Sequence, residues 1–248
     1  MNMNHASSKG EFIMVNIDNL KIASFQVSIF TPAVLFSKSK ILERLIGSFA
    51  DSFDGDIVAI PIPKDAPKEI PRITLHSADE KLRLDIAESR VNLFRYRKDD
   101  DVGTDTSQIL DFSFRVMKEY KDCTQSVIGR LALVVVRFLK NEKPASTLAS
   151  YFCRERFTKE LFDQIHDFEI HSHKKYTLRK FNVNSWVRCQ TGRPAKDNQP
   201  IILVTQDINT FAEELETTDF SLEQVKAFLQ VAHREQEQIL CQYFSKKK

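Results

Sequence analysis

The sequence predicts an α+β fold in which antiparallel sheets carry helices on one face. Three observations favour this class. Stretches rich in β-forming residues alternate apolar and polar side chains, amphipathic helical stretches separate them, and the same order recurs in both halves of the chain. In symbols, each half is expected to form a β-α-β-β-β-α unit. A hydrophobic content of 42%, with 19 Phe and only 6 Gly, is sufficient to build a buried core.

The first half is expected to begin with a strand and a helix. The stretch "KIASFQVSIFTP" is rich in β-formers and stops at Pro32. From Ser39 to Phe53, apolar residues recur at steps of three and four, and Gly55 suits the end of a helix. This spacing predicts an amphipathic helix that directly follows the first strand.

A meander of strands and a second helix should complete the first half. The stretches "DIVAIPIP", "EIPRITLHS", "KLRLDIA" and "RVNLFRYRK" are typical of successive antiparallel strands. Pro61 and Pro63 are two residues apart, so both missing N–H groups lie on one side of the chain, as in an edge strand or an extended connector. The following helix, "QILDFSFRVMKEYKD", has Asp105, Thr106 or Ser107 as its cap.

The second half repeats the order. The stretch "VIGRLALVVVRFL" predicts a buried strand, and Pro144 opens a helical region that extends to Ile165. The stretches "DFEIHSHKK", "YTLRKFNVNSWVRCQTG" and "PIILVTQDI" predict three more strands. A long C-terminal helix follows, in which Ser221 and Gln224 form a capping box.

The expected organisation is a disordered tail (1–12), an N-terminal half (13–122) and a C-terminal half (123–248). The pattern, not residue identity, suggests that the halves arose by internal duplication, either as two units or as one domain. Two antiparallel sheets, or one long sheet built from both halves, would bury one face under the helices. The other face would be open to solvent or to a partner.

Composition and motifs exclude several classes of function. The net charge of +2 provides no global attraction to nucleic acid or to an anionic membrane. The four cysteines lie far apart and are expected to be reduced, and no apolar leader or membrane span is present, which predicts a cytoplasmic protein without a membrane role. Scattered glycines and the lack of GxSxG or HExxH motifs predict no cofactor and identify no catalytic residue.

Two surface groups carry chemistry. In "HDFEIHSHKK", a strand would project Glu169, His171 and His173 from one face as candidate ligands of a divalent metal. The simpler interpretation is the polar face of a half-exposed strand. The second group is basic and surrounds the sole tryptophan, so it could bind nucleic acid by stacking and phosphate contacts, unless the tryptophan packs in the core. Its members are Arg179, Lys180, Trp186, Arg188 and Arg193.

Three segments carry a resemblance: "GRLALVVVRFL", "IILVTQDINTF" and "SLEQVKAFLQVAHREQEQILCQYF". A strand with D-I-N before a final helix that contains His233 resembles the C-terminal signature of a sporadically distributed family of uncharacterised bacterial proteins. The element order of that family is similar to SecB-like α+β modules. The resemblance implies a bacterial cytoplasmic protein of the kind carried in defence or mobile-element neighbourhoods, with no assigned enzyme activity and no site residues.

The expected function is a non-enzymatic module whose sheet face or edge binds another protein, in a bacterial defence or toxin-control system. The sequence leaves two alternatives open. One is a nucleic-acid-binding subunit that uses the Trp186 group, and the other is a metal-dependent hydrolase at Glu169, His171 and His173. Association with a second copy of the chain is a further alternative for the partner.

Overall fold

A computed structural model describes residues 15–32, 36–59, 61, 63, 65–98, 105–193 and 198–244 of the chain. The tail predicted at 1–12 lies outside the described residues. The described residues form helices and an antiparallel sheet, which confirms the predicted α+β class. Residues 57–59 form an edge strand that ends before Pro61, in keeping with the poor pairing capacity of the proline-rich segment.

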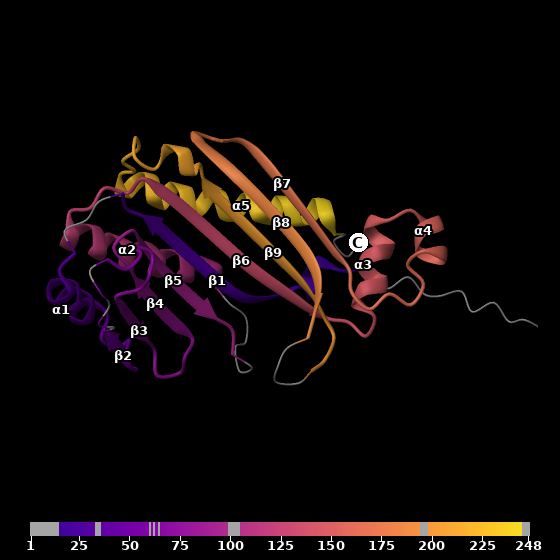
Figure 1. The fold of residues 1–248 in the computed structure, drawn as a ribbon, viewed down its shortest axis with the longest axis horizontal. Coiled ribbons are helices and arrows are strands. Elements are labelled where there is room, and N and C mark those ends of the chain that lie inside the picture. Colours follow the sequence, from indigo (N-terminus) through magenta and orange to yellow (C-terminus); the bar gives the residue numbers. More distant parts are fainter. Residues whose placement is uncertain are drawn as a thin grey trace, which may run out of the picture.

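The described strands form a single open sheet in the order β2-β3-β4-β5-β1-β6-β9-β8-β7 (Figure 1). All neighbouring pairs are antiparallel. The strands are β1 (Lys21–Phe30), β2 (Ile57–Ala59), β3 (Ile73–His76), β4 (Leu82–Ile86), β5 (Arg90–Tyr96), β6 (Arg130–Lys140), β7 (Glu169–Leu178), β8 (Phe181–Gly192) and β9 (Ile201–Thr210).

The two halves of the chain share this sheet through the pairing of β1 with β6. Phe25 lies opposite Val135 and Val27 opposite Leu133, and β5 pairs with the other side of β1. Apolar side chains on both strands face the same core. Of the two alternatives that the sequence left open, the structure therefore shows the one long sheet.

The order of elements differs from two β-α-β-β-β-α units in both halves. In the first half the four stretches expected as strands form β2, β3, β4 and β5, so four strands lie between the two helices where the symbol pattern has three. In the second half the predicted helical region divides into two helices. Cys153 and Arg154 both have extended backbone conformations, which interrupt the helical hydrogen bonds between the two segments.

The main helices pack on one face of the sheet. In Figure 1 the long C-terminal helix runs behind β6, β9 and β8, the helix of residues 106–124 lies against β5, and the helix of residues 38–49 packs beside that helix at the left of the view. The helices are α1 (Lys38–Phe49), α2 (Thr106–Thr124), α3 (Pro144–Phe152), α4 (Glu155–Glu160) and α5 (Leu222–Tyr243), with short 3₁₀ segments at Ile17–Asn19 and Ala212–Glu214.

The core lies between these helices and the sheet. Phe25 and Val27 of β1 join a buried apolar cluster with Met117 of α2 and Phe228 of α5. A smaller cluster, which includes Leu148 of α3, lies between the C-terminal end of α5 and strands β8 and β9. Because each strand alternates its side chains between the two faces, the residues between these core positions point away from the helices.

Caps fix the ends of the long helices. Asp105 accepts hydrogen bonds from the backbone N–H groups of Ser107 and Gln108 at the start of α2. Ser221 and Gln224 form the predicted capping box of α5, which confirms the C-terminal helix. These side chains satisfy N–H groups that the helix itself leaves without acceptors.

A buried polar network also ties α5 to the sheet. Gln236 Nε2 donates to the carbonyl oxygens of Leu133 (3.0 Å) and Gln206 (3.1 Å). Arg137 on β6 is 2% exposed, donates to Gln206 Oε1 at 2.6 Å and pairs with Glu237 of α5. These hydrogen bonds fix the position of α5 on β6 and β9, although Gln236 Oε1 has no hydrogen-bond partner among the described residues.

Candidate functional site: the open face of the sheet

No described helix covers the second face of the sheet, which we call the open face. It is formed by the strand residues that alternate with the core residues. On the inner strands they include Ser24, Gln26, Ser28 and Phe30 of β1, Arg90, Asn92, Phe94 and Tyr96 of β5, Arg83 and Asp85 of β4, Arg130, Ala132, Val134 and Val136 of β6, Thr205, Asp207 and Asn209 of β9, and Asn184, Trp186 and Arg188 of β8. The edge strand β7 adds Glu169, His171, His173 and Lys175.

The strand register aligns open-face side chains in one row across both halves. Starting from β7, the cross-strand partners are His173, Trp186, Asp207, Val134, Gln26, Phe94 and Arg83. The row combines aromatic rings, charged groups and an amide. A partner that lies along it would contact strands from both halves of the chain at once.

Aromatic side chains at the two ends of the row are held by neighbours. Trp186 stacks on His173 with ring centroids 3.7 Å apart and planes inclined by 4°. Phe94 stacks on Tyr96 at 5.9 Å, and the guanidinium of Arg83 lies 5.0 Å from the Phe94 centroid. Stacking restricts these rings before any partner arrives, so less conformational entropy is lost when they bind.

Small polar side chains between these rings are buried although no helix covers them. Asn92 and Asn209 are 6% and 4% exposed. Asn209 accepts hydrogen bonds from Arg130 (2.8 Å) and Asn184 (3.2 Å). In contrast, Asn92 Oδ1 and the Nε of Arg90, both on β5, are buried without a hydrogen-bond partner among the described residues.

Several cations of the open face already have acidic partners. Arg188 forms two contacts with Glu169, at 2.6 Å and 2.9 Å. The hydrogen bond from Arg188 lowers the pKa of Glu169. Arg83 pairs with Asp85, whereas Arg130 donates to the neutral acceptors Asn209 Oδ1 and Thr210 O.

A hollow of about 330 Å³ opens on this face over β8 and β9, lined by His171, Trp186, Arg188, Thr205 and Asp207. Asp207 Oδ1 accepts a hydrogen bond from Asn209 Nδ2 at 3.0 Å. Burial raises the pKa of Asp207, against the lowering effects of that hydrogen bond and of the charge on Arg130. The hollow therefore combines an indole ring with a poorly hydrated carboxyl group.

The candidate metal ligands share the open face of β7. Glu169 is engaged by Arg188, and His173 stacks on Trp186 while its Nε2 lies 3.0 Å from Asn184 Oδ1. Within the ranges that the structure describes, no group of three or more His, Cys, Asp or Glu side chains is arranged to hold a metal ion.

The structure separates the basic group predicted around Trp186. Trp186 is half-buried on the open face, and Arg188 is its neighbour in the hollow. Arg179 and Lys180 form the turn between β7 and β8, and Arg193 follows the opposite end of β8. Arg188 is therefore the one cation of the four that lies beside Trp186.

Sequence reasoning missed the part of the hollow that β9 contributes. Thr205 and Asp207 stand at alternate positions in "IILVTQDINT", between the core residues Val204 and Ile208. Period-two alternation was the available signal, and it would have placed both residues on the face opposite the core.

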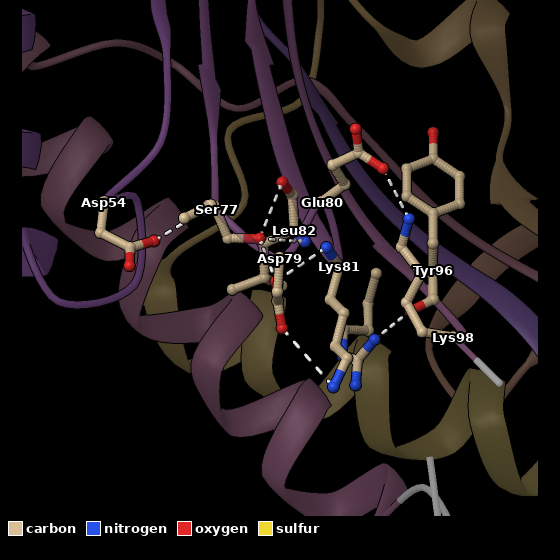
Figure 2. Close-up of polar contacts among 10 residues, drawn as sticks. Asp54, Ser77, Asp79, Glu80, Lys81, Leu82, Tyr96 and Lys98 are labelled. Atoms are coloured by element: carbon tan, nitrogen blue, oxygen red, sulfur yellow. Dashed lines mark hydrogen bonds and ion pairs between the residues drawn. The ribbon is translucent and has the colours of Figure 1, made fainter. Parts of the chain in front are cut away.

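A second polar cluster closes the turn between β3 and β4 (Figure 2). Ser77 Oγ donates to Asp79 at 2.7 Å and accepts from the Leu82 N–H at 2.8 Å. Lys98 Nζ pairs with Glu80 at 2.7 Å. These groups satisfy one another, so the cluster stabilises the turn.

Comparison of the sequence with protein-family models and with curated proteins finds no match. Among the described residues, no helix is long and apolar enough to cross a membrane.

Proposed function

We propose that the protein is a non-enzymatic binding module that holds another protein against the open face of its sheet. One observation carries the proposal: the described helices leave one face of a nine-stranded sheet uncovered, and that face presents ordered aromatic and arginine side chains. Trp, Tyr and Arg dominate the binding energy of protein interfaces. The open face carries all three.

The charges favour protein over nucleic acid as the partner. Binding to a phosphate backbone requires cations that are free to replace counterions. On the open face Arg188 and Arg83 already pair with Glu169 and Asp85, and Lys175 contacts Glu213 at 3.0 Å. Breaking these pairs would offset part of any gain from phosphate contacts.

Two finer expectations accompany the proposal. We propose that the two halves arose by duplication. In each half the first strand pairs with the last, β1 with β5 and β6 with β9, and the two first strands pair with each other. From the sequence resemblance we also propose a cytoplasmic role in a bacterial defence or toxin-control system.

Affinity capture with matched variants tests the proposal. The immobilised wild-type chain should retain a partner from a native, nuclease-treated lysate in a defined stoichiometry, and Phe94→Ala should release it. The control is Phe114→Ala, which also removes a half-buried phenyl ring. Phe114 lies on α2, on the helix side of the sheet, where Lys226 lies over its ring. Retention of the partner by the wild type and both variants, or by none of them, would contradict binding at the open face. Light scattering of the purified chain shows whether the partner is a second copy.

Nucleic-acid binding is the second candidate, because Trp186 is half-buried at the surface beside Arg188. A salt titration of single- and double-stranded oligonucleotide binding tests it. Arg188→Ala and Arg179→Ala should each weaken binding and reduce its salt dependence. Equal affinity of wild type and both variants would exclude this role.

A further inference from the structure

The hollow on β8 and β9 is lined by side chains of different chemistry. Trp186 provides an indole ring, held in place by the parallel stack with His173. Across the strand pair, Trp186 lies directly opposite Asp207. The hollow of about 330 Å³ is at the lower end of the range for small-molecule pockets, which suits a single long side chain.

Hydrogen bonds fix the orientation of the Asp207 carboxyl group. Asn209 Nδ2 donates to Oδ1 of Asp207, and Asn209 is itself held by Arg130 and Asn184. Within the described part of the chain, Oδ2 has no hydrogen-bond partner. Asp207 Oδ2 is therefore an oriented hydrogen-bond acceptor that is available to a ligand in the hollow.

The cations near the hollow are committed to other groups. Arg188 lines the hollow, but its guanidinium group contacts the Glu169 carboxylate through two nitrogen atoms. Arg130 donates to Asn209 Oδ1 and to the carbonyl oxygen of Thr210 at 3.0 Å, not to Asp207. The carboxyl group of Asp207 is the one acidic group of the lining, so charge complementarity favours a cationic ligand.

We propose that this hollow binds a lysine or arginine side chain of the partner protein, with the cation against the Trp186 ring and in contact with Asp207. The inference rests on the proposed function and names the chemistry of the partner. Tryptophan is the best aromatic surface for a cation, and a charge-assisted hydrogen bond to a carboxylate is about twice as strong as a neutral one. The two contacts act on the same cation.

The sole tryptophan provides a direct readout, because its emission reports on the hollow itself. The probes are the capped tripeptides acetyl-Gly-Arg-Gly-amide and acetyl-Gly-Lys-Gly-amide, with acetyl-Gly-Gln-Gly-amide as the neutral control. We expect a saturable change in Trp186 fluorescence with the two basic peptides alone. Asp207→Asn keeps the size of the side chain and should weaken the binding of both by about tenfold or more.

Arg188→Gln separates a cation site from an anion site. The substitution removes a positive charge from the lining of the hollow, so the basic peptides should bind with equal or higher affinity. Inorganic phosphate should produce no saturable response in any variant. The proposal fails if neither basic peptide gives a saturable response, if Asp207→Asn binds them as well as wild type does, or if phosphate saturates the signal and Arg188→Gln abolishes it.

Failure of the cation site is distinguishable from failure of the proposed function. If the peptides do not bind but Phe94→Ala still releases a captured partner, the open face is a protein-binding surface whose partner does not place a cation in the hollow. If the peptides bind and no partner is captured, the hollow is a cation site without the wider interface.

Discussion

Trp186 and Asp207 lie directly opposite each other on neighbouring strands, on the face of the sheet that no described helix covers. Their side chains line a hollow that His171 of the edge strand β7 also lines. Aromatic and ionisable groups usually occur together either in a buried network or at a site of recognition. The position of Trp186 and Asp207 on the open face favours a role in recognition. Their contributions to stability can therefore be measured separately from their contributions to binding.

Replacement of Trp186 should cost little stability for so large a side chain. Trp186→Ala removes a half-buried ring and its stack with His173, and we expect a loss of about 1–2 kcal/mol in the free energy of unfolding. Phe228→Ala, in the core between α5 and the sheet, should cost about 3–5 kcal/mol. Urea unfolding followed by circular dichroism measures both, and equal losses would mean that Trp186 has a core role.

Asp207 should make stability depend on pH in the opposite sense to a salt-bridged carboxylate. Burial raises its folded-state pKa above the ordinary value of 3.8, so its contribution to stability is fully present below 3.8 and is lost as the pH rises through the raised value. Asp207→Asn removes this titration. We therefore expect the variant to melt at a higher temperature than wild type at about pH 7, with the difference shrinking toward about pH 3.

Glu169→Gln is the matched control for this pH dependence. The hydrogen bond from Arg188 lowers the folded-state pKa of Glu169, so its contribution is present above the unfolded-state pKa and is lost on acidification. The variant should melt slightly below wild type at about pH 7, because the ion pair is exposed to solvent. The same sign for Glu169→Gln and Asp207→Asn would contradict the assigned environments.

His233 should destabilise the fold on acidification. Burial lowers its pKa despite the opposing effect of Glu237, and its ring packs against Phe25 with centroids 6.1 Å apart. Neighbouring Arg137 also disfavours a second positive charge. The contribution of His233 to stability is therefore fully present above pH 6.5, the unfolded-state pKa. It is lost as the pH falls from that value through the lower pKa of the folded state.

Thermal melts between about pH 7 and pH 5 measure this effect of His233. His233→Gln should flatten the profile, because a neutral amide does not titrate. Glu237→Gln should steepen it, because the carboxylate that favours the charged imidazole is removed. A profile that His233→Gln leaves unchanged would assign the pH dependence to another group.

Two glycines should respond to alanine with opposite signs. A Cβ at Gly47 in α1 meets no atom within 4 Å, so Gly47→Ala should raise stability by about 0.5–1 kcal/mol through helix propensity. A Cβ at Gly129 would lie 1.9 Å from the carbonyl oxygen of Leu215, which forces the backbone to move. Gly129→Ala should therefore lower stability by more than about 2 kcal/mol, and chemical denaturation of the pair checks both signs.

Local sequence patterns predicted the elements that depend on neighbouring residues. The capping box of Ser221 and Gln224 and the cap at Asp105 mark helices that the structure confirms, because a cap forms between residues two or three positions apart. The subdivision of the helical region after Pro144 was not predicted. It depends on an extended backbone at Cys153 and Arg154, which no side-chain periodicity signals.

Only part of the candidate site could be predicted. The alternation in "HDFEIHSHKK" correctly suggested that Glu169, His171 and His173 share a face, and the structure places them on the open face of β7. Asp207 was missed because its partner in the hollow, Trp186, lies on another strand. Conversely, Arg179 and Arg193 are close to Trp186 in sequence and lie at opposite ends of β8, because a strand extends about 3.3 Å per residue.

The sequence by itself determined the α+β class, most helices and strands, and which side chains of a strand share a face, because these properties follow from local periodicity and propensity. The tertiary structure decided that β1 pairs with β6, that both halves share one sheet, and that no helix of the described residues covers one of its faces. Strand pairing depends on contacts between residues more than a hundred positions apart, such as Val27 and Leu133, and no local pattern encodes which strands will meet.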